Sequence, residues 1–173
     1  MPTPTYTAIA TTTVGAGGTA NITFTSIPST YTDLTILFSG RSNYTATTHD
    51  YYFYRFNSDS GSNYTARALF GDGGSALSLT NTYSGNLAVS TSNTSTASSF
   101  GNSLIYVPNY TTANKKGSYS DSVHETNATA AVMGLYANLW NNTAAITSIT
   151  LVPVGGTLWN QYSTATLYGI KNS

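Results

Sequence analysis

The sequence predicts an all-β protein, an antiparallel β-sandwich of jelly-roll-like type with about eight to ten strands. Segments rich in β-branched and aromatic residues recur along the chain, and turn signals separate them roughly every ten residues. No segment has a convincing helical period. A chain of 173 residues buries enough surface for one core, so we expect a single domain over residues 1–173.

The expected strands follow one another with short connections. In the first half they are 6–14, 20–25, 34–38, 50–56 and 64–70. Residues 75–99 are mostly Ser, Thr and Asn, and there we expect one or two short strands with mobile loops. The second half gives strands at 104–107, 119–125, 130–140, 146–154 and 161–170. Segment 130–140 also has a helical spacing, but Gly134 and the Asn141-Asn142 turn favour a strand.

The charge content limits the kinds of partner. Only 7% of residues are charged, and six basic side chains balance six acidic ones. Nucleic-acid binding and electrostatic attachment to a membrane need basic clusters, so we expect neither partner. No apolar run approaches the roughly 20 residues of a membrane span, and the N-terminus lacks signal-peptide features. A surface this neutral favours association with other proteins.

Segment 50–56 is aromatic on both faces of its expected strand. Alternation places Tyr52, Tyr54 and Phe56 on one face and Tyr51, Phe53 and Arg55 on the other. A two-layer domain buries only one of these faces within itself, so the other must lie under a loop or against a partner.

The residues that carry chemistry are few and scattered. The sequence lacks cysteine, a Gly-x-Ser-x-Gly elbow and a His-Glu-x-x-His motif. His49 and His124 each stand beside a carboxylate that points to the opposite strand face, and pairing of their two strands would let the two imidazoles meet. The turn residues Asp59 and Asp72 match backbone-capping aspartates, and a calcium-binding loop is the alternative. We therefore expect no enzyme activity, no catalytic residue, no metal and no cofactor.

Trp140 and Trp159 stand near expected strand ends and allow three interpretations. In the first interpretation the two rings pack in the core or at a sheet edge. In the second they contact another protein, and in the third they form a platform for a glycan. Aromatic side chains are common in all three kinds of site. The scarce Arg41, Arg55 and Arg67 are expected to pair with Asp, a backbone carbonyl or a partner chain. Lys115-Lys116 is expected to be a solvated turn tip.

Several segments resemble short β-rich virion proteins of tailed bacteriophages, notably those that infect cyanobacteria. The resemblance rests on SIPSTYTDL at 26–34, YRFNSDSG at 54–61 with NYT at 63–65, and IYVPNY at 105–110. Its most specific part is AAITSITL at 144–151 followed by QYSTATLYGIK at 161–171. It covers most of the chain, and 75–99 matches least.

The resemblance implies a non-enzymatic virion structural protein. Such modules occur as capsid decoration (cement) proteins and within tail fibres, and the absence of a long shaft favours a decoration protein on the capsid surface. The expected partners are the major capsid protein and other copies in a homotrimer. A tail-fibre or receptor-binding module that recognises a host glycan is the alternative. Synthesis is expected in the host cytoplasm.

The candidate interface residues combine an N-terminal arm, at about residues 1–8, with aromatic positions elsewhere. The arm is expected to reach the capsid or an adjacent copy, and the second face of strand 50–56 is expected at the trimer interface. The candidates are Pro2, Thr3, Pro4, Tyr6, Tyr51, Phe53, Arg55, Trp140 and Trp159.

Overall fold

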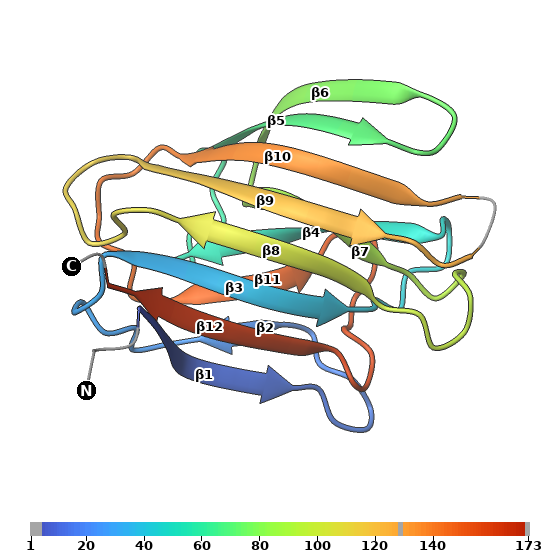
Figure 1. Ribbon diagram of the computed structural model, residues 1–173, viewed down its shortest axis with the longest axis horizontal. Helices are drawn as coiled ribbons and strands as arrows, with labels where there is room; N and C mark the ends of the chain where they lie inside the picture. Colours follow the sequence, from blue (N-terminus) through green and yellow to red (C-terminus); the bar gives the residue numbers. More distant parts are fainter. Residues whose placement is uncertain (1–4, 128–129, 172–173) are drawn as a thin grey trace.

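Two antiparallel sheets face each other in the computed structural model, which describes residues 5–127 and 130–171 (Figure 1). The described residues form twelve strands and no helix, so none of their segments is a helix able to cross a bilayer. The strands are β1 (Tyr6–Thr13), β2 (Ile22–Phe24), β3 (Asp33–Gly40), β4 (His49–Phe56), β5 (Tyr64–Gly71), β6 (Ala76–Tyr83), β7 (Asn86–Thr91), β8 (Gly101–Val107), β9 (Lys116–His124), β10 (Val132–Trp140), β11 (Ile149–Pro153) and β12 (Thr164–Ile170).

Eight of these strands form a jelly roll. The order β1-β12-β3-β8 in one sheet faces β2-β11-β4-β7 in the other, and the chain crosses between the two layers at every step except between the paired strands β4 and β7, as in a jelly roll. The predicted antiparallel sandwich is confirmed. The predicted count of eight to ten strands is too low: the described residues form twelve, because the ten segments expected elsewhere are joined by two strands in 75–99, β6 and β7.

The insertions widen one sheet only. β5 and β6 leave the jelly roll between β4 and β7, while β9 and β10 leave it between β8 and β11. They join edge to edge beyond β8 in the order β9-β10-β5-β6, which makes an eight-stranded sheet opposite a four-stranded one. Figure 1 shows the β5–β6 hairpin at the far end of this wide sheet.

Aromatic rings fill the core between the layers. Tyr52, Tyr54 and Phe56 of β4 are fully buried and point toward the eight-stranded sheet. Tyr52 meets the Trp159 ring at 5.5 Å between centroids, and Phe56 meets Trp140 at 5.6 Å, both edge to face. A chain with so few charges buries rings instead of ion pairs.

The expected N-terminal arm is shorter than residues 1–8. Tyr6, Thr7 and Ala8 already belong to β1 and pair with Ile170, Gly169 and Tyr168 of β12. β-branched Thr and Ile side chains favour this extended conformation from the start of the strand. Pro2, Thr3 and Pro4, the other arm candidates, lie outside the described residues.

The expected solvated tip at Lys115-Lys116 is wrong for Lys116. This residue begins β9 and is buried, while Lys115 is exposed. The Lys116 ammonium donates to the carbonyl oxygens of Thr112, Asn114 and Thr143, and thereby ties two loops together. Burial lowers the pKa of this ammonium, so three carbonyl acceptors compensate for lost hydration.

Candidate assembly interface

The outer face of the eight-stranded sheet, the face turned away from the four-stranded sheet, carries large apolar side chains in contact with solvent. Met133 is 63% exposed, Leu69 61% and Leu135 54%. We call the full set the apolar patch: Leu37, Leu69, Leu104, Tyr119, Val123, Met133, Leu135 and Leu139. Sheets with one solvated face place polar residues there, so this face departs from the usual pattern.

Strand register makes the apolar patch contiguous. The pairs Leu37–Leu104, Leu104–Asp121, Asp121–Leu135 and Leu135–Leu69 form one row across five strands. Directly paired residues on one face lie about 5 Å apart at their Cβ atoms, so neighbours in this row touch. The patch is therefore one surface and not a set of scattered exposed residues.

The insertions, and not the jelly roll, supply most of this surface. Leu37 and Leu104 come from the jelly-roll strands β3 and β8, while the other six residues come from β5, β9 and β10. β10 shows how the sequence achieves this: its inner positions are buried, and its outer positions include Met133, Leu135 and Leu139. Strands that the fold does not need thus expose apolar residues, which indicates a functional and not a structural origin.

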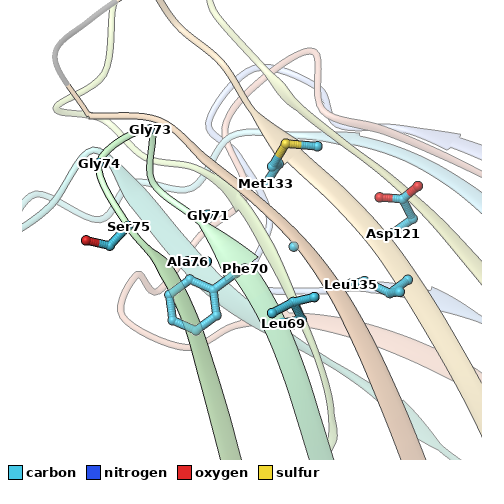
Figure 2. A pocket seen from close by; sticks show the side chains of 11 residues that line it. Leu69, Phe70, Gly71, Gly73, Gly74, Ser75, Ala76, Asp121, Met133 and Leu135 are labelled. Carbon is cyan, nitrogen blue, oxygen red and sulfur yellow. The ribbon is translucent and has the colours of Figure 1, made fainter.

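Shallow hollows lie on this outer face. One is lined by Leu69, Met133 and Leu135 together with Asp121 and the turn at 71–76. Figure 2 shows Leu69 of β5 and Leu135 of β10 side by side, with Met133 further along β10 and Asp121 on the neighbouring strand β9. A second hollow lies beside Leu37, Leu104 and Val123. Such relief lets a partner's side chains interlock with the patch.

A third hollow has a different chemistry. The Tyr106 and Tyr119 rings lie 5.6 Å apart between centroids, and Asn109, Asn114 and Lys115 are among the other residues that line the hollow. The Tyr106 hydroxyl donates to Asp33 Oδ2 at 2.8 Å. This hydrogen bond is the largest of the effects that raise the pKa of Tyr106 to about 12. The hollow thus presents a tyrosine pair edged by amide groups and one cation.

Exposed charges on the patch and its border are sparse. On the outer faces of β3, β8, β9, β10 and β5, the exposed charged residues are Asp121 and Arg67. Arg67 Nη1 donates to Thr80 Oγ1 at 2.7 Å, and the exposed carboxylate of Asp121 makes no hydrogen bond to the described residues. The patch is therefore neutral, with one anion and one cation.

The expected interface on strand β4 is corrected by the structure, because the chain covers that face itself. Tyr51, Phe53 and Arg55 are half-buried. Phe53 meets the Tyr83 ring of β6 at 5.8 Å, and Arg55 Nε donates to Ser84 O at 2.7 Å. The β5–β6 insertion curls round the edge of the smaller sheet and packs on its second face. A two-layer sandwich without insertions would have left these rings bare.

Both tryptophans are core residues, as the first of the three interpretations predicts. Their assignment as interface residues is therefore wrong. Trp140 is 1% exposed and Trp159 0%. Trp140 Nε1 donates to Asp59 Oδ2 at 2.8 Å, and Trp159 Nε1 donates to Leu151 O at 3.1 Å. Trp140 ends β10 at an inner-facing position, and Trp159 lies in the connection between β11 and β12 with its ring in the core, so neither ring reaches a protein or a glycan.

Tyr6 is the predicted interface residue that the structure leaves open. It is 59% exposed at the start of edge strand β1, and register places it on the same outer face as Tyr106. The apolar patch itself was missed, although a signal existed. Segment 130–140 has apolar residues at both strand parities, as segment 50–56 does.

The two histidines meet, although their strands lie in different sheets. The His49 and His124 rings are 6.0 Å apart between centroids. His124 is 1% exposed, its Nδ1 lies 3.1 Å from Thr91 Oγ1, and its Nε2 has no partner among the described residues. Within residues 5–127 and 130–171 no group of three or more His, Cys, Asp or Glu is placed to hold a metal.

Stability is expected to fall between pH 6.5 and pH 4 because of His124. Burial, followed by repulsion from His49, lowers the pKa of His124 from 6.5 to about 4; Glu125 opposes this shift and Arg41 adds to it. The unfolded chain therefore binds the proton first, and the free energy of unfolding drops by about 3 kcal/mol across this interval. Urea unfolding at several pH values measures the drop, and His124→Asn is expected to reduce it. Equal drops in both proteins would contradict the assignment.

Comparisons with known proteins give no match. A scan against models of protein families finds none that fits this chain, and searches of curated proteins and of solved structures likewise return no similar protein.

Proposed function

We propose that this chain is a non-enzymatic structural subunit of a phage virion, a capsid decoration protein that binds the assembled shell and stabilises it. The observation that carries the proposal is the apolar patch, which a subunit inside an assembly covers and a solitary protein leaves in water. The virion setting comes from the resemblance of segments such as 144–151 and 161–171 to phage proteins. Jelly rolls occur in viral capsid proteins and in lectins, which agrees with this setting by analogy of fold.

The proposed mechanism is mass action. A protein that binds the closed shell, and not its separate subunits, shifts the equilibrium toward the closed shell by its binding free energy. The chain needs no cofactor for this role. Its low charge agrees with binding by burial of apolar surface, which ionic screening affects little.

Binding to shells tests the proposal. Purified protein is expected to co-sediment with decoration-free shells of its phage at a copy number matching the lattice, and to raise their heat resistance. Leu135→Glu is expected to lower the bound fraction by about tenfold or more, because the molecule that covers the patch in the assembly, a shell subunit or a second copy of this chain, would desolvate a carboxylate at its centre. Val154→Glu, a matched change at an exposed apolar residue off the patch, is expected to bind normally. Normal binding by Leu135→Glu would contradict the role of the patch.

A tail-fibre module that binds a host glycan is the second candidate. The hollow with the Tyr106–Tyr119 pair favours it, since sugar rings pack on tyrosine and bond to amide groups. Under this function the protein is present in a few copies per virion and binds a glycan array, and Tyr119→Ala removes the binding. Copy number per virion separates the two functions.

A further inference from the structure

We propose that the apolar patch is covered by a second copy of this chain, in a two-fold dimer whose axis lies over β10 between Leu135 and Ala137. This inference rests on the proposed function only in needing an assembly, and it names the molecule that covers the patch. Two features carry it: the placement of the two exposed charges, and the match that the same axis creates between apolar residues.

Asp121 and Arg67 are placed to pair across such an axis. Asp121 lies on β9 and Arg67 on β5, with β10 between them, and Arg67 is one outer-face position further along the strands. With strands about 4.8 Å apart and outer-face residues repeating about every 6.8 Å, the two are about 12 Å apart. A two-fold axis in the interface plane that bisects this separation brings each Asp121 against Arg67 of the other copy. Both charges are then neutralised, and each formed pair is equivalent.

The same axis matches apolar residues. With the strand and residue spacings given above, the two-fold axis places Leu135 over Leu69 of the second copy, and Leu69 over Leu135 of the second copy. It also brings Tyr119 over the Ala137 and Leu139 region of the second copy. The strands of the two copies then cross at about 70°, close to the orthogonal class of sheet packing. In Figure 2 Leu69 and Leu135 lie beside each other on neighbouring strands, so each can contact its counterpart in the second copy.

The area is sufficient for a dimer. The five strands centred on β10, from β8 to β6, together with four outer-face positions along them, measure roughly 20 Å by 20 Å, and the relief of this region raises its accessible area to roughly 600 Å² per copy. The total of about 1,200 Å² reaches the lower limit of specific interfaces. We expect a dissociation constant on the order of 10 µM, because small interfaces of this kind bind weakly. The three-fold arrangement expected from the sequence had used β4, which the chain covers itself.

Charge reversal tests the proposed Asp121–Arg67 pairs between the two copies, and it does so with substitutions that are expected to leave each chain folded. Asp121→Arg and Arg67→Asp lie on an exposed face, and each is expected to weaken self-association by about tenfold or more through two like-charge contacts. Sedimentation velocity over a series of concentrations measures association, and thermal unfolding confirms that each variant folds. The double variant carrying both reversals is expected to dimerise as the native chain does.

An equimolar mixture of the two single variants gives the decisive result. One chain then presents two cations and the other two anions, so a heterodimer has both pairs restored, and it is expected to form with native affinity. Failure of the mixture to associate, or a native chain that is monomeric up to about 200 µM, overturns the inference. If the chain is monomeric but binds shells through Leu135, the dimer inference is wrong and the proposed function stands. If the chain forms the dimer but binds no shell, the proposed function is wrong and the dimer inference stands.

Discussion

Replacing Trp159 by alanine is expected to lower the free energy of unfolding by about 4 kcal/mol, because it removes one of the two largest fully buried side chains of the core. The indole meets Phe38 at 4.8 Å and Tyr52 at 5.5 Å between ring centroids, and it bonds to a backbone carbonyl. Alanine leaves a cavity among rigid rings that do not collapse to fill it.

Equilibrium unfolding in urea measures this loss. Leu135→Ala is the matched control, since it removes a large apolar side chain that is 54% exposed, and it is expected to cost less than about 0.5 kcal/mol in the monomer. The pair of variants separates residues that hold the core from residues that the fold leaves free for contact. A small loss in Trp159→Ala would refute the core position of this ring.

Replacing Arg41 by methionine is expected to lower the free energy of unfolding by about 3 kcal/mol, with the effect concentrated in the loop at 93–99. Arg41 is 8% exposed. Its Nη1 donates to Thr96 O and Ser99 O, both at 2.9 Å, and its Nη2 to Ser95 O at 3.1 Å. Methionine keeps the stem but leaves these carbonyls without their donor.

Hydrogen exchange locates the effect. In Arg41→Met the amides of 93–99 are expected to exchange faster, while those of β12 change little. Arg41→Lys serves as the control for charge, because an ammonium lacks the planar fork that reaches acceptors on both sides, and we expect it to recover only part of the stability. Unchanged exchange in 93–99 would contradict the role of this guanidinium.

The alternation of side chains between the two faces of a strand predicted much of the fold. Tyr52, Tyr54 and Phe56 are core residues because one strand parity of an aromatic segment must be buried, and the sequence shows this directly. Turn residues placed most strands within a few positions. Lys116 was misjudged because two lysines before a glycine look like a turn, and only the fold brings Thr112 and Thr143 carbonyls round the ammonium.

The interface predictions for the two tryptophans and for the second face of β4 were wrong for a related reason. Trp140 and Trp159 were candidates because aromatic rings are common at contacts, but the sequence does not state which layer a strand-end ring faces. The second face of β4 was expected to need a partner, and Tyr83 of the β5–β6 insertion covers it instead. Whether a strand face is covered depends on which strands from distant parts of the chain pack against it, and the local sequence pattern carries no information about that.

By itself, the sequence determined an all-β sandwich, a core built of rings and a surface almost without charge, because these follow from residue type and a period of two. The tertiary structure decided which apolar faces remain bare. The order β8-β9-β10-β5 joins segments far apart in the chain, and it alone places Leu104, Asp121, Leu135 and Leu69 in one row. A surface of this kind depends on which strands become neighbours, and hydrogen bonds between distant segments set that order.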